Sequence, residues 1–339
     1  MSYILRSVEE RDVRDLQVLS SQFTMINLPN DAKVLARKIE KSQNSFAGLI
    51  KNNAEAEYIF VVEDTETERV VGSSLILAKH GTKEEPHFYF KVTKKEHFSS
   101  DLGIGFVHQV LKLEEEANGP TEIGGLLVDS EYRRDPEKIG KQISLVRFLF
   151  MAMYPERFES KILCELSPPQ MAQGKSEFWE AMGRRFTGLP YQEADKLSHR
   201  YKEFIHSLFP KEEIYTCVLS SAARFVLGRV GDETRPAQHL LEKLGFKYLN
   251  EVDPFDGGPH FGVVTNEVPL IKNAKHLEVS SRDQAEFKNY GLVGFMRDGK
   301  FLAKHTAYHL DGDRIVLPGT TKEILKLSAN DKVCLTEIV

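Results

Sequence analysis

One stretch of the chain combines an apolar strand, a basic turn and a glycine in an order that suits the binding of a pyrophosphate. It reads Ile-Gly-Gly-Leu-Leu-Val-Asp-Ser-Glu-Tyr-Arg-Arg from Ile123 to Arg134 and continues through Ile139-Gly140-Lys141 into an apolar helix. The first N–H groups of such a helix have no intrahelical partner and lie at the positive end of its dipole, where phosphates bind. An ordinary strand–turn–helix, in which the glycine only shapes the turn, explains the local pattern equally well.

Several carboxylates are candidates for proton transfer or for binding a cation. Glu122 precedes the strand just described and Glu165 ends the next one. Either can accept a proton from an ammonium group, directly or through water, and a solvated or salt-bridged role is an equal alternative. Asp256 lies in a Gly-Gly-Pro turn, which it can shape, and a carboxylate is also what a guanidinium group binds.

The histidines give no metal signal. Four of them lack the spacing of metal ligands, so structural roles are favoured and no metal is expected. These are His80, His87, His97 and His108.

The composition excludes several classes of protein. A length of 339 residues predicts two or three compact units, and 41% apolar with 28% charged residues is typical of a globular chain. The 45 basic and 50 acidic residues give a net charge of −5 with scattered cations, so no nucleic-acid partner is expected. The three separated cysteines fit a reducing cytoplasm, and the absence of an apolar run of ~20 residues predicts no membrane span.

Hydrophobic periodicity predicts the elements that position these residues. Strands are expected at Tyr3–Val8, Tyr58–Glu63, Val70–Ala78, Thr121–Asp129, Lys161–Leu166 and Phe246–Asn250. Helices are expected at Arg11–Phe23, Ala32–Ser45 (after a turn and N-cap at 27–31), Gly140–Met153 and Arg235–Leu244. The second and third strands should form a hairpin, and His87–Thr93 should extend the same antiparallel sheet. Glu114–Glu116 are interpreted as a solvated helical face.

Two segments break this alternation. Residues 168–225 carry Trp179 and several phenylalanines in helical patterns, which predicts a helical insertion. From about residue 273 the chain has short alternating strands separated by Asp-Gly and Pro-Gly turns, which predicts a small β-barrel-like subdomain. We therefore expect one domain over residues 1–272 and a second over 273–339.

A second motif gives the first one a context. Pro236-Ala-Gln-His-Leu-Leu-Glu-Lys-Leu-Gly-Phe246 taken alone is a core-packing helix closed by glycine. Together, the two motifs resemble the paired signatures of the GNAT superfamily of acyl-CoA-dependent N-acyltransferases. The resemblance implies an α+β fold with a mixed, mainly antiparallel sheet flanked by helices. In that superfamily two central strands splay apart and the thioester lies between them.

Further motifs, in order from residue 3 to about 270, are similar to the arginine N-succinyltransferase family. They include Asn27-Leu-Pro-Asn, Tyr58-Ile-Phe-Val-Val-Glu-Asp, Ser176-Glu-Phe-Trp, Pro210-Lys-Glu-Glu-Ile-Tyr and Phe255-Asp-Gly-Gly-Pro259. The resemblance implies transfer of succinyl from succinyl-CoA to the α-amino group of arginine, or of ornithine in some members, as the first step of arginine degradation. It also implies no permanently bound cofactor, and a homodimer or a hetero-oligomer with a related chain.

The residue types and positions, read together with the resemblance, give candidate site residues in three groups. Those for acyl-CoA are Leu126, Leu127, Val128, Arg133, Arg134, Lys138, Gly140 and Lys141. Those for the acceptor are Asp256, Gly257 and Gly258, and the catalytic candidates are Glu122, Glu165 and His239.

Four positions depart from the family's pattern. The phosphate turn R-K-x-G-x-G is one residue longer here and keeps only Gly140, so Lys138 and Lys141 become phosphate contacts. E-M-R-G is replaced by Glu165-Leu-Ser-Pro, which lacks the basic residue and allows another acyl donor. The family's Gly-Thr-Gly-Gln segment is replaced by Ser198-His-Arg-Tyr.

The fourth departure concerns catalysis. The histidine of the family's G-Q-V-H-P, which the resemblance implies as proton donor, corresponds to Gly231. This leaves three alternatives open. The chain is a slow N-acyltransferase in which His239 or water supplies the proton, a non-catalytic supporting subunit of the same fold, or an enzyme with another donor or amine.

Overall fold

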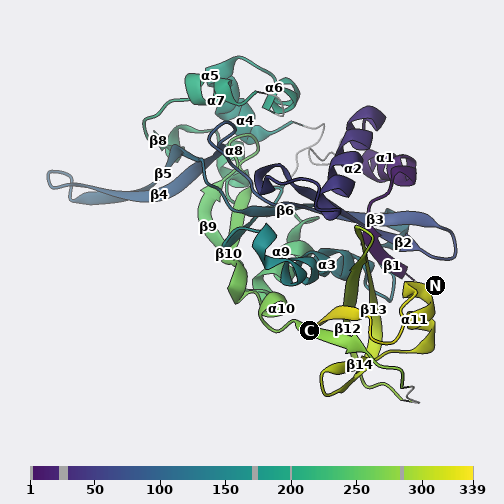
Figure 1. Ribbon diagram of the computed structural model, residues 1–339. Helices are drawn as coiled ribbons and strands as arrows, with labels where there is room; N and C mark the ends of the chain where they lie inside the picture. Colours follow the sequence, from purple (N-terminus) through teal and green to yellow (C-terminus); the bar gives the residue numbers. More distant parts are fainter. Residues whose placement is uncertain (1–2, 23–29, 170–174, 199–200, 283–285, 339) are drawn as a thin grey trace. The chain divides into compact units, whose positions relative to one another are not determined.

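The computed structural model describes residues 3–22, 30–169, 175–198, 201–282 and 286–338. It divides into two compact units, each built from separate stretches of the chain (Figure 1). Unit 1 comprises Met1–Lys79, Thr121–Ser160 and Val264–Val339, and unit 2 comprises His80–Pro120 and Lys161–Val263. Phe23, most of the 27–31 turn, and His199 and Arg200 lie outside the described residues.

An antiparallel sheet forms the centre of unit 1. Its order is β1 (Tyr3–Ser7), β2 (Glu57–Asp64), β3 (Arg69–Leu77) and β6 (Thr121–Val128), so the predicted hairpin of the second and third strands is confirmed. Helices α1 (Val13–Ser21) and α2 (Ala32–Phe46) cover one face and α3 (Ile139–Met153) the other (Figure 1). Alternation along β2 explains this arrangement. Ile59 packs with α1 and α2, whereas the Phe60 ring lies 5.5 Å from that of Phe150 on α3.

The C-terminal part of unit 1 is a five-stranded barrel. Strands β11 (Lys275–Val279), β12 (Asn289–Arg297), β13 (Lys300–Asp311), β14 (Arg314–Val316) and β15 (Lys332–Glu337) run in the order β12-β15-β11-β14-β13. Pairing of β12 with β13 closes the ring and confirms the predicted barrel. The sequence pattern did not indicate α11 (Gly319–Leu325). Strand β13 also pairs with β1, and the boundary at 272/273 stays a prediction.

Unit 2 contains six strands in the order β7-β10-β9-β4-β5-β8. Their bounds are β7 (Lys161–Glu165), β10 (Pro259–Val264), β9 (Lys247–Val252), β4 (His87–Ser99), β5 (Ile104–Glu116) and β8 (Ile214–Tyr215). Strand β4 pairs with β5 and β9 and not directly with β3. The helical interpretation of Glu114–Glu116 is wrong, because these residues end β5 and pair with the start of β4.

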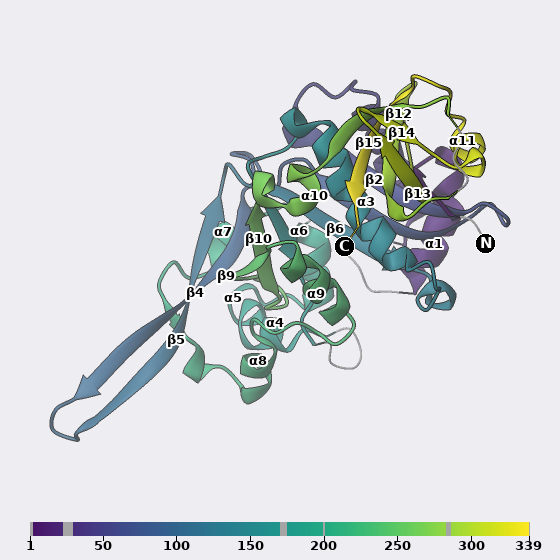
Figure 2. The ribbon, with the colours of Figure 1, turned by 90° about the horizontal axis from the view of Figure 1, so that it is seen from below.

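Strands β4 and β5 form a long ribbon that projects from unit 2 (Figure 2). Thirteen consecutive residue pairs join them, and only the proximal part pairs further, with β9 and β8. Beyond it both outer edges of the ribbon lack a neighbouring strand among the described residues, and charged side chains are typical of such edges. The distal half exposes Phe98, Leu102, Ile104, Phe106 and Val107.

Short helices make up the rest of unit 2 and confirm the helical insertion. They are α4 (Glu177–Ala181), α5 (Gly183–Thr187), α6 (Tyr191–Ser198), α7 (Glu203–Leu208), α8 (Ser221–Val226) and α9 (Arg235–Lys243). Trp179 is fully buried, and its ring stacks 4.9 Å from that of Phe255. Trp179 is therefore a core residue. The short α10 (Pro269–Lys272) belongs to unit 1, and no helix among the described residues is long and apolar enough to cross a membrane.

Candidate active site

The strand that leads to the candidate acyl-CoA turn contains a β-bulge. Leu75 pairs with Gly124 and Ser73 with Leu127, so β6 uses one residue more than β3 over this interval. Gly125 has φ +57, and a Cβ there would lie 2.7 Å from a methyl carbon of Leu75, which explains why the position is glycine. A bulge leaves its extra residue outside the ladder, so backbone groups near Leu126 are not all used by β3.

The turn after β6 ends at a helix N-terminus. Asp129 and Asp135 each accept a backbone N–H through Oδ1, from Glu131 at 3.0 Å and Glu137 at 2.8 Å. Lys138 has φ 55, and its carbonyl oxygen accepts the N–H of Lys141 at 2.9 Å. Helix α3 therefore begins at Ile139, and its first N–H groups face the end of the helix rather than an intrahelical acceptor.

Gly140 is the glycine of the predicted phosphate-binding turn. A Cβ at this position would lie 3.5 Å from Cγ2 of Val128, which is ordinary van der Waals contact. The packing of the described residues therefore does not require glycine here. Arg133, Arg134 and Lys138 are exposed around the turn, so the eight predicted acyl-CoA residues form one continuous strand–turn–helix segment of unit 1.

The catalytic candidates divide between the two units. Glu122 lies in β6 of unit 1, opposite Leu77, and is only 4% exposed. Glu165 ends β7 of unit 2, and its side chain is about one third exposed. His239 lies on the exposed side of α9. The structure thus places Glu165, but not His239, among other polar side chains of unit 2.

Three histidines surround Glu165. No motif or spacing in the sequence indicates this grouping. Oε1 of Glu165 lies 3.8 Å from Nδ1 of His87 and 3.7 Å from Nε2 of His260. Nε2 of His80 lies 2.7 Å from Nδ1 of His87. These side chains come from separate strands and a loop, so spacing along the chain could not indicate their contact. His260, which directly follows the Gly-Gly-Pro turn, was not among the predicted site residues.

His87 is held in its neutral form. Burial, together with the nearby His80 and His260, brings the pKa of His87 well below the ordinary value for histidine. Among the residues that the structure describes, Nε2 of His87 is buried and has no hydrogen-bond partner. A buried neutral imidazole of this kind offers a lone pair rather than a charge.

The loop that carries Asp256 is fixed by its own hydrogen bonds. Oδ1 of Asp253 accepts the N–H groups of Phe255 and Asp256 at 2.7 and 2.8 Å, and Oδ1 of Asp256 accepts that of Gly258 at 2.7 Å. Gly257 has φ +77, and a Cβ on Gly258 would lie 2.4 Å from the carbonyl oxygen of Leu166. Asp256 therefore shapes the turn through its hydrogen bond, and the backbone of the turn requires glycine at both 257 and 258.

Carboxyl groups are concentrated beside this loop. Burial and the charge of Asp253 raise the pKa of Asp256, and the same two causes raise the pKa of Asp195 to about 7. Like charges that cannot all ionise together create a site that a cation would stabilise. The cluster therefore suits a guanidinium or ammonium group.

Gly231 lies against the loop that follows β7. Its N–H donates to the carbonyl oxygen of Ser167 at 2.9 Å. A Cβ at this position would lie 2.7 Å from the carbonyl oxygen of Pro168, which is closer than real side chains approach a backbone oxygen. Gly231 therefore leaves the space that the backbone of the Ser-Pro-Pro segment after Leu166 occupies.

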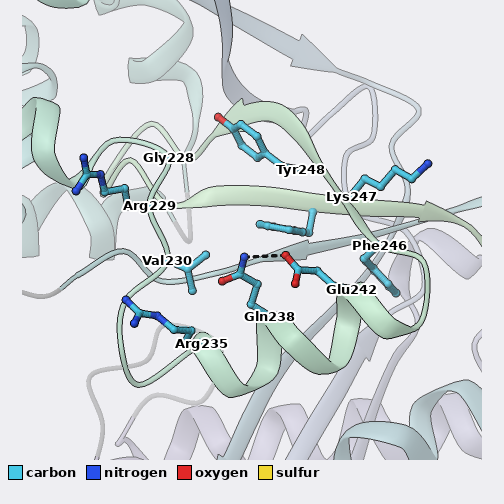
Figure 3. A pocket seen from close by; sticks show the side chains of 10 residues that line it. Gly228, Arg229, Val230, Arg235, Gln238, Glu242, Phe246, Lys247 and Tyr248 are labelled. Carbon is cyan, nitrogen blue, oxygen red and sulfur yellow. Dashed lines mark hydrogen bonds between the residues drawn. The ribbon is translucent and has the colours of Figure 1, made fainter. Parts of the chain in front are cut away.

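A pocket of about 600 Å³ opens elsewhere in unit 2, between the loop before α9, α9 itself, β9 and β10 (Figure 3). Its polar side includes Arg229, Arg235 and Lys247, and Gln238 donates to Glu242 at 2.8 Å across its floor. None of the sequence-predicted site residues lines it.

Comparison of the sequence with known proteins identifies a family that matches most of the chain. The model of the arginine N-succinyltransferase beta subunit family matches residues 3–270. Arginine N-succinyltransferase of Yersinia pestis is 33% identical over 350 residues, which is 98% of this chain and 97% of that protein. The enzyme of Citrobacter koseri is 33% identical over 340 residues, covering 99% and 97%.

Similarity to a solved structure extends this result to the fold. Arginine/ornithine succinyltransferase subunit AI from Pseudomonas aeruginosa superposes with a TM-score of 0.83 at 28% identity, over 99% of this chain and 98% of that one. The predicted GNAT-like α+β fold is confirmed. The matches run the length of the chain, from β1 to the barrel. The chain therefore belongs to the arginine N-succinyltransferase family.

Proposed function

We propose that this protein transfers a succinyl group from succinyl-CoA to the α-amino group of arginine, with ornithine as a second acceptor. The observation that carries the proposal is the full-length similarity to arginine N-succinyltransferases, at 33% identity with near-complete coverage of both chains. The reaction is an aminolysis: the amine attacks the thioester carbonyl, the C–N bond forms, the C–S bond breaks, and CoA leaves as a thiol.

The candidate acyl-CoA segment supplies two functions in this scheme. The N–H groups at the start of α3, with Arg133, Arg134 and Lys138 around them, bind the pyrophosphate. Backbone N–H groups near the bulge in β6, from Leu126 to Val128, polarise the thioester carbonyl as its oxygen gains charge. Succinyl-CoA is a cosubstrate here, and no cofactor remains bound.

The acceptor is a cation, and the carboxyl cluster of unit 2 suits it. Burial raises the pKa of Asp195, Asp253 and Asp256, and the charge of Asp253 raises the pKa of the other two further, so the three carboxyl groups do not all ionise. A bound guanidinium would let more of them ionise. Of the two carboxylates considered as base for the α-ammonium group, Glu165 is the better placed, because its side chain is one third exposed whereas Glu122 is 4% exposed.

The departing thiolate makes a dedicated proton donor less necessary. A thiol has a pKa of about 8.5, so the C–S bond can break with water as the source of the proton. The absence of a positioned acid typically costs about 10²–10⁴-fold in rate. Gly231 is therefore compatible with a slow enzyme, and exposed His239 is not required.

One assay tests the proposal directly. Purified protein is incubated with succinyl-CoA or acetyl-CoA and with arginine, ornithine or a neutral amino acid, while thiol release is followed and products are identified by mass spectrometry. We expect N-succinylarginine as the main product. Turnover with neutral amino acids but none with arginine or ornithine would refute the acceptor, and turnover only with acetyl-CoA would refute the donor.

We also infer an oligomer in the cytoplasm, where acyl-CoA is available. The family description and the Pseudomonas aeruginosa structure both carry the word subunit, which supports assembly with a second or related chain. Light scattering during gel filtration measures the mass. A monomer at micromolar concentration, active without any partner, would contradict this inference.

A further inference from the structure

Glu165 has two contacts with histidines that are too long to be hydrogen bonds. Nδ1 of His87 is 3.8 Å from Oε1 of Glu165, and Nε2 of His260 is 3.7 Å from the same oxygen. Hydrogen bonds between nitrogen and oxygen fall at about 2.7–3.2 Å, so neither contact is one. The three side chains nevertheless converge on one point within a largely buried part of unit 2.

The same distances approach those between two ligands of one metal ion. Zinc binds histidine nitrogen and carboxylate oxygen at about 2.0–2.2 Å, so tetrahedral ligand atoms lie about 3.4 Å apart. Nε2 of His80, Nδ1 of His87 and Oε1 of Glu165 all lie within 4.8 Å of one another. Only the pair His80 and His87, now 2.7 Å apart, would have to open, and His80 lies in a half-buried loop after β3.

The chemistry of the side chains favours a borderline divalent ion. His87 is buried and neutral, so its Nδ1 can offer a lone pair once the proton shared with His80 moves to the other ring nitrogen. Glu165 and Glu251 contribute negative charge, offset in part by Lys91, whose Nζ lies 2.9 Å from Oε1 of Glu251. Two imidazoles and one carboxylate form a common ligand set for zinc that leaves one position open.

We propose that His80, His87 and Glu165 bind a divalent transition-metal ion, zinc in the first place. Oε1 of Glu165 provides the third ligand and leaves the other carboxylate oxygen for the role proposed above. The His260 ring lies 5.2 Å from that of His87, and its Nε2 lies 3.7 Å from Oε1 of Glu165, so it packs beside the proposed ligands and is not one of them. The inference concerns metal binding alone, and its test needs no transferase activity.

The test measures metal binding by protein that carries no polyhistidine tag. The full chain is treated with a chelator, dialysed, and titrated with ZnCl₂ by calorimetry, and bound zinc is counted by elemental mass spectrometry after gel filtration. The variants His80→Ala, His87→Gln and Glu165→Gln remove one ligand each. The matched control is the double variant His97→Ala/His108→Ala, which removes one exposed and one half-exposed imidazole from the β4–β5 ribbon of the same unit.

We expect one equivalent of zinc in the wild type and in the control, with an increase of the melting temperature on adding zinc in both. Each ligand variant should bind zinc at least 100-fold more weakly and show no such increase. His260→Ala should keep the one equivalent. No saturable binding to the wild type, or unchanged affinity in folded His87→Gln and Glu165→Gln, would overturn the site. Loss of zinc in His260→Ala with retention in His80→Ala would overturn this choice of ligands.

Discussion

The N–H of Gly231 donates a hydrogen bond to the carbonyl oxygen of Ser167 at 2.9 Å, which joins the loop before α9 to the loop after β7. The carbonyl oxygen of Pro168 occupies the space that a side chain at Gly231 would need. The Glu165-Leu-Ser-Pro segment and Gly231 are therefore coupled by packing.

Restoring a histidine at this position should not restore a proton donor. We expect Gly231→His to lower the free energy of unfolding by about 1–3 kcal/mol, because a Cβ would lie 2.7 Å from the oxygen of Pro168. Turnover should not rise. Urea denaturation measures the change, with Gly319→Ala as control, since no atom lies within 4 Å of a Cβ there. A fully stable Gly231→His protein with increased activity would contradict the coupling.

A pair of substitutions at Gly140 separates ligand binding from folding. Gly140→Ala adds a methyl group in ordinary contact with Val128 and should keep both stability and acyl-CoA affinity. Gly140→Glu places a negative charge at the first turn of α3, where the phosphates are proposed to bind, and should weaken acyl-CoA binding about tenfold or more. Calorimetry with succinyl-CoA measures both. Equal affinities in the two folded variants would show that the phosphates bind elsewhere.

Arg6 holds a buried ion network in unit 1. Its guanidinium donates to both oxygens of Asp12 at 2.7 Å and to Glu63 at 2.5 Å, and the residue is 5% exposed. Arg6→Ala leaves the buried Asp12 without its cation and Glu63 with Arg11 alone, which should cost about 3–5 kcal/mol. Arg11, half-exposed, binds the same Glu63, and Arg11→Ala should cost less than about 1 kcal/mol. Chemical denaturation measures the free energy of unfolding of both variants. If Arg6→Ala and Arg11→Ala lower it by similar amounts, Arg6 does not stabilise the network more than Arg11 does.

Asp195 should make stability depend on pH. Burial and Asp253 raise the pKa of Asp195 from 3.8 to about 7, so between pH 4 and 7 the folded chain keeps a proton that the unfolded chain has lost. The free energy of unfolding therefore falls as pH rises through this window. Since one pKa unit corresponds to about 1.4 kcal/mol, we expect Asp195→Asn to gain on the order of 2 kcal/mol over the wild type at pH 8 and nothing at pH 4.

The control for this experiment is Asp101→Asn, in the exposed turn of the β4–β5 ribbon. It shows the effect of removing one exposed carboxylate from the same unit. A difference between Asp195→Asn and the wild type that is the same at pH 4 and at pH 8 would contradict the prediction for Asp195.

The sequence was sufficient where local pattern and packing agree. The Asp31 N-cap, whose Oδ1 accepts the N–H groups of Lys33 and Val34, starts α2 at the predicted residue. The barrel strands followed from period-two alternation between Asp-Gly turns. These features depend on residues close together in the chain, so periodicity and turn chemistry were enough to find them.

The features that sequence reasoning missed depend on long-range pairing. Strand β4 pairs with β9, more than 150 residues later, and no local signal indicates that choice over β3. Glu114–Glu116 have a composition suited to a helix surface, yet pairing with β4 fixes them as strand. His260 meets Glu165 and His87 only because β10, β7 and β4 belong to the same unit. Three separate choices of strand partner were needed before these histidines could be recognised as a group.

The pairing of β1 with both β2 and β13 has a consequence for how the chain is made. Leu5 lies opposite Val62 on one side and Ala303 on the other. During synthesis on the ribosome, the first strand can find its early neighbour at once, but its second neighbour is translated near the end. Until then one edge of the nascent sheet has unsatisfied backbone groups, the kind of edge that recruits foreign strands. A chain stopped before β13 would therefore be a substrate for chaperones rather than a smaller folded protein.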